Sequence, residues 1–286
     1  MLRSFFDRLF ALFQYILPHH PLSRVMLRLT RSRGIFKDIF TPWFIKNFNI
    51  EMELAEEPDW KRYDCFNSFF TRALKADARP VVTGENAIAS PVDACISQAA
   101  KIRGDNIFQA KGHQYSLNTL VGGDNRYSDL FENGTFATMY LSPRDYHRIH
   151  MPIDGTLKQV IHVPGRLFSV SPGTTRNIPG LFARNERVVC IFETAAGPMA
   201  MILVGAIFVS SIETVWQGVV TPPSSKRIRQ WDYHDKNVVL KKGEEMGRFN
   251  MGSTVILLFA ENKITWDKKV AADTPFKMGE LLGNII

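Results

Sequence analysis

The stretch EEMGRFNMGSTVILLF, residues 244–259, joins a turn-like segment to a short apolar run. Its last part, TVILLF at 254–259, is made of β-branched, aliphatic and aromatic residues and has the length of a strand rather than of a helix. We therefore expect a strand that begins directly after the tripeptide Gly252-Ser253-Thr254.

Similar apolar runs recur from Pro80 onward, separated by Gly, Pro, Asn and Asp. The clearest ones are 135–141, 156–163, 187–192, 199–209 and 254–259. Glycine and proline interrupt the long apolar stretch 195–212, which predicts two buried strands rather than a spanning helix. The pattern indicates an α+β fold, in which amphipathic N-terminal helices precede a β-rich, sandwich- or barrel-like catalytic body.

The first 50 residues differ from the rest in charge and in aromatic content. They hold eight Lys or Arg against two Asp, and eight of the 21 Phe, so most of the net charge of +7 lies here. Apolar residues recur at helical spacing in 2–17, 22–29 and 35–48, and FNSFFTRAL at 66–74 predicts a further helix. Cationic and apolar faces on the same helices fit an anionic membrane surface better than a nucleic acid. We expect a membrane-binding region over 1–50 and a catalytic domain over 51–286, although packing of the helices on the body is an alternative use of these faces.

The run Leu9–Leu17 follows two arginines, as in a signal peptide, but the PHHP at 18–21 offers no small-residue cleavage site, so we expect the segment to be retained. The three cysteines, Cys65, Cys95 and Cys190, are far apart and none belongs to a CxxC pair. This usage predicts a reducing compartment and no disulfide framework, and we expect no metal site. We expect a peripheral protein on the cytoplasmic side of the cell membrane.

Ser253 is a candidate nucleophile. A serine hydroxyl is a poor nucleophile unless a base and a constrained geometry activate it, and the preceding Gly252 has an unhindered carbonyl. Ser253 can attack that carbonyl, convert the amide to an ester and cut the chain by β-elimination. The tripeptide is also common in ordinary turns, so it does not decide the matter alone.

Two histidines, His147 and His150, lie three residues apart in YLSPRDYHRIHMP at 140–152. No HExxH pattern or third ligand accompanies them, whereas a histidine that titrates near neutrality suits a general base. Asp93, in SPVDACISQ at 90–98, is of the type that orients a histidine in a Ser-His-Asp arrangement, and is equally suited to a turn. A GxSxG motif is absent around Ser253, which disfavours an α/β-hydrolase.

Six longer motifs resemble those of the bacterial membrane-associated phosphatidylserine decarboxylases, and they follow the family's order over nearly the whole chain. They are AKGHQYSL at 110–117, YLSPRDYHRIHMP at 140–152, PGRLFSV at 164–170, LFARNERV at 181–188, VGAIFVSSIETVW at 204–216 and EEMGRFNMGSTVILLF at 244–259.

This resemblance implies a proenzyme that cuts itself between Gly252 and Ser253 into a β chain, 1–252, and an α chain, 253–286, which remain associated. Ser253 then becomes a pyruvoyl group, which forms a Schiff base with phosphatidylserine in an anionic membrane. By the same resemblance, Asp93, His150 and Ser253 form the charge relay for cleavage, and His147 serves decarboxylation or protonation. No nucleic acid is expected, and homo-oligomerisation stays open.

Two other classes of protein remain compatible with the residues. One is a membrane-associated serine hydrolase that uses Asp93, His150 and Ser253 and keeps its chain intact. The other is a non-catalytic β module that binds membranes. In both of these the bond between Gly252 and Ser253 persists.

Overall fold

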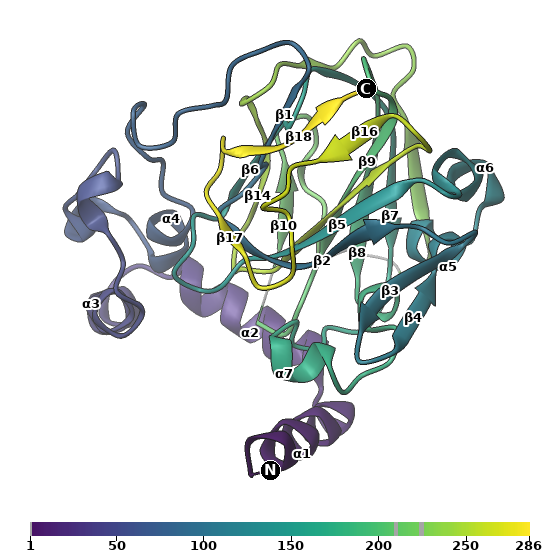
Figure 1. The fold of residues 1–286 in the computed structure, drawn as a ribbon. Helices are drawn as coiled ribbons and strands as arrows, with labels where there is room; N and C mark the ends of the chain where they lie inside the picture. Colours follow the sequence, from purple (N-terminus) through teal and green to yellow (C-terminus); the bar gives the residue numbers. More distant parts are fainter. Residues whose placement is uncertain (1, 209–210, 223–225) are drawn as a thin grey trace.

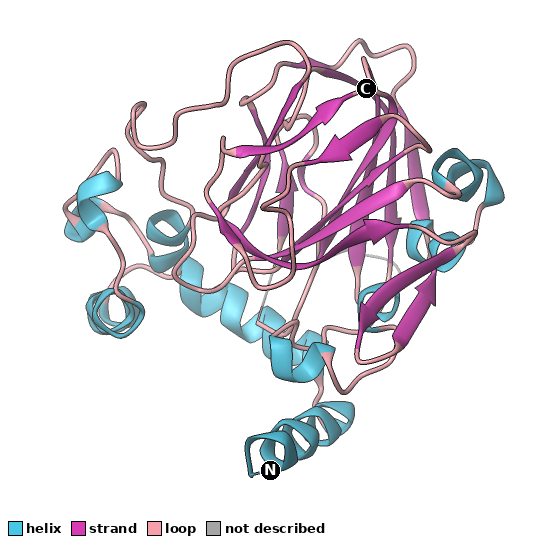
Figure 2. Cartoon of the chain, viewed as in Figure 1, coloured by secondary structure: helices cyan, strands magenta, loops and turns pink. Residues whose placement is uncertain are grey.

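The computed structural model describes residues 2–208, 211–222 and 226–286, with side chains from residue 5 onward. Val209 and Ser210, inside the motif at 204–216, lie outside the described residues. The predicted order, a helical N-terminal segment followed by a sheet-rich body, is confirmed (Figures 1 and 2).

Three helices open the chain, of which the first two are amphipathic and the third is apolar on most sides: α1 (Leu2–Ile16), α2 (His19–Arg31) and α3 (Ile35–Phe48). In Figure 1, α1 and α2 lie along the lower edge of the sheet-rich body and α3 lies to its left. Helix α1 contacts the short helix α7 (Pro172–Thr175), whereas α2 and α3 both contact α4 (Phe66–Phe70). No described helix combines the length and the apolar character needed to cross a membrane.

The helix expected over 66–74 is shorter than predicted. Helix α4 ends at Phe70, where Thr71 leaves the helical conformation and its hydroxyl donates to the carbonyl of Asn67 at 2.9 Å. Leu74 then forms an isolated bridge with Ala55. The hydroxyl cap of Thr71 therefore ends the helix before the apolar pattern does.

The body is built on a nine-stranded sheet in which each neighbouring pair is antiparallel. In spatial order its strands are β12 (Arg229–Asp232), β7 (Gly155–Val163), β8 (Arg187–Thr194), β9 (Gly197–Val204), β15 (Thr254–Phe259), β5 (Thr135–Tyr140), β2 (Ala94–Lys101) and β17 (Pro275–Phe276), with β13 (Val239–Leu240) beside β7. Within the described part of the chain the sheet is open, so the barrel-like variant of the prediction does not close.

Smaller sheets and single turns complete the body. One sheet joins β1 (Ala87–Ala89), β18 (Leu281–Ile285) and β16 (Ile264–Trp266); another joins β11 (Gly218–Val219), β10 (Ile212–Thr214), β14 (Glu245–Phe249) and β6 (Arg148–His150); a hairpin pairs β3 (Asn106–Ala110) with β4 (His113–Ser116). Short helices are α5 (Leu117–Val121), α6 (Asn125–Ser128) and α8 (Leu181–Arg184), with 3-10 turns at Met52–Leu54, Trp60–Arg62 and Asp129–Phe131. The stretch 195–212, for which we expect two strands, contains β9, and its last residue begins β10.

Strand β15 lies at the centre of the large sheet. It pairs along its whole length with β9 on one side and β5 on the other, and every residue from Thr254 to Phe259 is buried. A strand that is buried on both faces needs apolar residues at successive positions rather than at alternate ones, which explains the run TVILLF. The residue before β15, Ser253, is thereby fixed at one end of the central strand.

Replacement of Leu257 by alanine tests how much the protein depends on this strand. Leu257 is fully buried, so Leu257→Ala removes packed methyl groups and should lower the free energy of unfolding by about 3 kcal/mol. Urea unfolding followed by circular dichroism measures the change. Ile286→Ala, at a position 74% exposed, is the matched control and should change stability little; equal losses in the two variants would contradict the placement of β15.

Candidate functional site

Ser253 is held by main-chain groups of both strands that flank β15. Its backbone carbonyl accepts a hydrogen bond from the amide of Leu141 at 2.8 Å, just beyond β5. Its hydroxyl donates to the carbonyl of Val204, the last residue of β9. The serine is buried, so its position relative to the preceding peptide bond is tightly fixed.

His147 is the side chain that lies against that peptide bond. A Cβ atom added to Gly252 would lie 2.5 Å from its Nε2, so only glycine permits this approach. The ring of Phe70 lies 4.0 Å away, centroid to centroid, and the carbonyl of His147 accepts from the amide of Phe249 at 3.0 Å. Helix α4 and strand β14 thus fix the histidine from two sides.

Both ring nitrogens of His147 are buried and have no hydrogen-bond partner among the described residues. Burial, with the nearby charge of Arg72 as the next cause, lowers the pKa of His147 to about 3. The imidazole is therefore neutral at pH 7 and has one nitrogen free to accept a proton and one N–H free to donate. Unpaired buried polar atoms of this kind are rare and typical of sites that act on a ligand.

His150 lies on β6 and has partners at both nitrogens. Its Nδ1 donates to the carbonyl of Gly243 at 2.9 Å, since a carbonyl only accepts, and its Nε2 lies 3.3 Å from the hydroxyl of Tyr146. Burial lowers the pKa of His150, so the ring is a neutral base with its acceptor nitrogen toward Tyr146.

Asp93 is paired with an arginine that the sequence analysis did not single out. Arg79 donates to both carboxylate oxygens, at 2.8 and 2.6 Å, and the amide of Met278 adds a bond of 2.8 Å. Lys277 lies at 3.5 Å. Burial alone would raise the pKa of Asp93, but the hydrogen bonds and charge of Arg79 outweigh it and lower the pKa, so the carboxylate stays ionised.

The described arrangement brings His147 to Gly252 but does not join Asp93, His150 and Ser253 by hydrogen bonds. The backbone of His150 donates to the carbonyl of Pro91 at 2.9 Å, so the turn that carries Asp93 packs beside β6. Gly243, however, occupies the position beside Nδ1 that a relay gives to the aspartate. The relay therefore stays a prediction.

Sequence reasoning missed several neighbours of the site, among them Phe70, Arg72, Arg79 and Tyr146. Phe70 and Arg72 fall within FNSFFTRAL, which was read only as a helix. Tyr146 lies within the histidine motif itself, beside His147. The only available signal was proximity to motif residues, because the contacts join segments far apart in the sequence.

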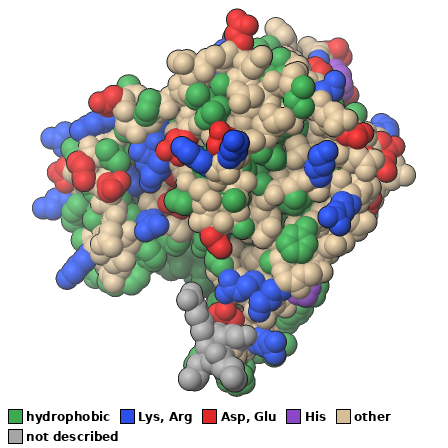
Figure 3. Space-filling view, viewed as in Figure 1, with side chains coloured by type: hydrophobic (Ala, Val, Ile, Leu, Met, Phe, Trp, Pro, Cys, Tyr) green, Lys and Arg blue, Asp and Glu red, His purple; other side chains and the backbone are tan. Residues whose placement is uncertain are grey.

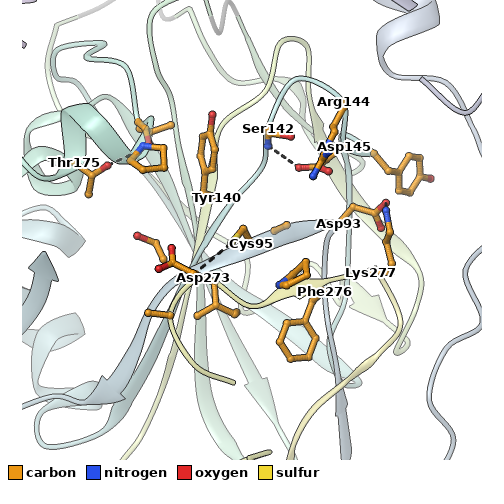
Figure 4. A pocket seen from close by; sticks show the side chains of 18 of the residues that line it. Asp93, Cys95, Tyr140, Ser142, Arg144, Asp145, Thr175, Asp273, Phe276 and Lys277 are labelled. Carbon is orange, nitrogen blue, oxygen red and sulfur yellow. Dashed lines mark hydrogen bonds and ion pairs between the residues drawn. The ribbon is translucent and has the colours of Figure 1, made fainter. Parts of the chain in front are cut away.

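A cavity of about 780 Å³ lies beside the turn that carries Asp93. Figure 4 shows Tyr140, Ser142 and Asp145 on its upper side and Asp93 beside Lys277 on the right. Arginines line it as well, Arg72 and Arg79 among them. Within the described residues no cluster of three or more His, Cys, Asp or Glu could hold a metal ion.

Comparison with known proteins shows which family the chain belongs to. The family model for phosphatidylserine decarboxylase matches residues 66–284. The chain belongs to the phosphatidylserine decarboxylase family. A second family model, described as PSD, matches residues 9–49, which cover most of the three N-terminal helices.

Curated members of the phosphatidylserine decarboxylase family are similar to this chain over almost its full length. The phosphatidylserine decarboxylase proenzyme of Hahella chejuensis is 53% identical over 284 residues, which are 99% of this chain and 96% of that protein. The proenzyme of Vibrio cholerae is 52% identical over 96% of this chain and 98% of its own length, and that of Methylococcus capsulatus is 52% identical over 97% and 96%. The match at 66–284 contains α4, both histidines and the Gly252–Ser253 bond.

The neutral state of His147 can be observed directly. Because its pKa is lowered to about 3, the ring should not take up a proton between pH 8 and pH 5. Nuclear magnetic resonance of ¹⁵N-histidine-labelled protein, with the His147 signals assigned from His147→Gln, measures its protonation. Titration of His147 near pH 6.5 would contradict its burial against Gly252.

Proposed function

We propose that this protein catalyses the decarboxylation of phosphatidylserine to phosphatidylethanolamine and carbon dioxide, after it has cut its own chain between Gly252 and Ser253. The observation that carries the proposal is the contact of a neutral, unpartnered His147 with the Gly252–Ser253 peptide, in a chain of this family. Family membership argues against a serine hydrolase and against a non-catalytic membrane module, the two alternatives left open by the residues.

Cleavage is an internal rearrangement of the chain. The Ser253 oxygen attacks the carbonyl carbon of Gly252, the amide nitrogen leaves that carbon and takes a proton, and an ester results. A base then removes the Cα proton of residue 253, the bond between Cβ and the ester oxygen breaks, and Gly252 leaves as a carboxylate while residue 253 becomes dehydroalanine. This enamine tautomerises to an imine, and water replaces its nitrogen, which leaves as ammonia, so that residue 253 becomes a pyruvoyl group.

The base for the first step is His150 in the predicted relay with Asp93. In the described arrangement the Ser253 hydroxyl donates to Val204, and the acceptor nitrogen of His150 is directed toward Tyr146. The relay therefore requires Ser253 to exchange its contact with Val204 for one with His150. Asp93, held ionised by Arg79, favours the protonated form of His150 through its charge.

The surroundings of residue 253 fit a pyruvoyl group. Gly252 leaves space for His147, and the two free nitrogens of that ring have no competing partner in the described chain. A pyruvoyl carbonyl supplies an acceptor for the electron pair that remains when carbon dioxide leaves. His147 then relays a proton to the product carbon: its N–H donates that proton while its other ring nitrogen accepts one from water, so that the ring stays neutral.

The two chains remain associated after the cut because the α chain is part of the sheets. Strand β15 is hydrogen-bonded to β9 and β5, and β17 to β2. Asp93 of the β chain also accepts from Met278 of the α chain.

Substitutions separate the two chemical steps. Ser253→Ala should stay a single chain without activity, since it lacks the attacking oxygen, and His150→Gln should stay largely uncut. His147→Gln should be cut but release carbon dioxide at least about 100-fold more slowly, within the range that one acid–base group contributes. Denaturing gels report cleavage, and release of ¹⁴CO₂ from carboxyl-labelled phosphatidylserine reports turnover.

The matched control is His234→Gln. His234 is exposed and pairs with Asp232 rather than with any residue of the site, so this variant should still be cut and should still release carbon dioxide. A cut His147→Gln protein with wild-type turnover would remove His147 from decarboxylation. Two chains from Ser253→Ala would contradict the cleavage chemistry.

The membrane-facing part of the proposal rests on helix α1. Ala11 and Gln14 are buried on the body, where Gln14 accepts from the amide of Ser169 at 2.6 Å. Phe6, Phe10 and Phe13 lie on another side of the helix and are 59%, 48% and 51% exposed. Figure 3 also shows hydrophobic side chains along the lower left of the molecule, where Figure 1 places α2 and α3, with Lys and Arg side chains nearby. Such a surface suits peripheral binding to anionic lipid, on the cytoplasmic side of the cell membrane.

Replacement of the three phenylalanines by serine tests this surface without removing the buried Gln14. The triple variant Phe6→Ser, Phe10→Ser, Phe13→Ser should lose at least about tenfold in binding to phosphatidylserine-containing vesicles, because apolar insertion contributes most of the affinity. Vesicle flotation measures it. Val239→Ser, 47% exposed on β13, is the control; undiminished flotation of the triple variant would exclude α1 as the anchor.

A further inference from the structure

Arg72 is a buried cation without a counterion. It is 6% exposed, its Nε has no hydrogen-bond partner among the described residues, and no described carboxylate lies within 4.0 Å of its guanidinium. The ring of Phe69 lies 5.4 Å from its guanidinium carbon. Burial lowers the pKa of Arg72, but a guanidinium remains charged at neutral pH. A buried unpaired charge is costly, so its retention indicates a missing anion.

Other arginines that line the cavity have their anions in place. Arg79 is bound by Asp93, and Arg176 donates to Asp7 at 3.0 Å. Arg144 is exposed and therefore hydrated. Arg72 alone combines burial, a position on the cavity wall and an unsatisfied guanidinium among the arginines described there. The anion that it lacks must therefore come from a ligand in the cavity.

Arg72 also lies next to the reacting centre. It follows Phe70, whose ring contacts His147, by two residues. Its charge is the largest cause after burial of the lowered pKa of His147. Arg72 thus lies on the cavity wall and close to the histidine that contacts Gly252.

We propose that Arg72 binds the phosphodiester of the lipid headgroup and so places the serine amine and carboxylate at residue 253. This inference rests on the proposed function. A guanidinium presents a planar set of donors that matches phosphate oxygens. The substrate carboxylate is the less suitable partner, because it loses its charge as carbon dioxide leaves, and an arginine on it would stabilise the starting state. The phosphodiester keeps its charge from substrate to product.

Kinetics with two substrates test the assignment. Dihexanoyl phosphatidylserine carries the phosphodiester, whereas O-hexylserine has the same amine and carboxylate without it. In cut Arg72→Gln protein, KM for the phospholipid should rise at least about tenfold with kcat changed less than about threefold, and kcat/KM for O-hexylserine should stay within about twofold. Arg72→Lys should restore part of the loss, and Arg126→Gln, at an exposed arginine that does not line the cavity, should match wild type.

An unchanged KM in Arg72→Gln, or equal losses with both substrates, would overturn the proposal. If Arg72→Gln is not cut, competition on the wild-type enzyme decides. Glycerophosphoethanolamine should then inhibit at least about tenfold more strongly than ethanolamine or inorganic phosphate. Equal inhibition by glycerophosphoethanolamine and ethanolamine would overturn the assignment. Stronger inhibition by inorganic phosphate would instead assign Arg72 to free phosphate. A wild-type protein that releases no carbon dioxide from either substrate would show that the proposed function itself is wrong.

Discussion

The position of strand β15 is the constraint on which the rest of the site depends. Strands β9 and β5 pair with β15 on its two sides. Ser253, directly before β15, is therefore held by hydrogen bonds to Leu141 and Val204. A shift of the strand by one residue would break its register with both β9 and β5. The bond that we propose is cut is therefore held beside His147 by the sheet, and strands from both proposed chains belong to that sheet.

The site then separates two electrostatic environments. Around Gly252, His147 and Phe70 form a buried surrounding, in which the carboxylate of the proposed substrate would be poorly solvated and its loss as carbon dioxide favoured. Two residues after Phe70, Arg72 provides a positive charge beside the cavity. We infer that this division of charge suits an anionic headgroup that keeps its phosphate and loses its carboxylate.

Much of the fold could be predicted from the sequence because the signals were local. Continuous apolar runs predicted the central strands, and helical spacing predicted the three N-terminal helices. The length of helix α4 was overestimated, because the helix ends at Thr71 through a hydrogen bond of a single side chain, which the apolar pattern does not show. The site was predictable only through motifs: nothing in the spacing of Asp93 and Arg79, or of His150 and Gly243, indicates that they pair. Such contacts depend on how distant turns pack together, which periodicity does not encode.

A denaturing intact-mass spectrum of freshly purified protein decides whether the chain is cut at residue 253 and carries a pyruvoyl group. We expect two chains, with the smaller one beginning at residue 253 and lighter than a simple hydrolysis product by one ammonia molecule. A small chain that keeps an intact N-terminal serine would contradict formation of the pyruvoyl group. A single full-length mass in protein that decarboxylates phosphatidylserine would contradict the account altogether.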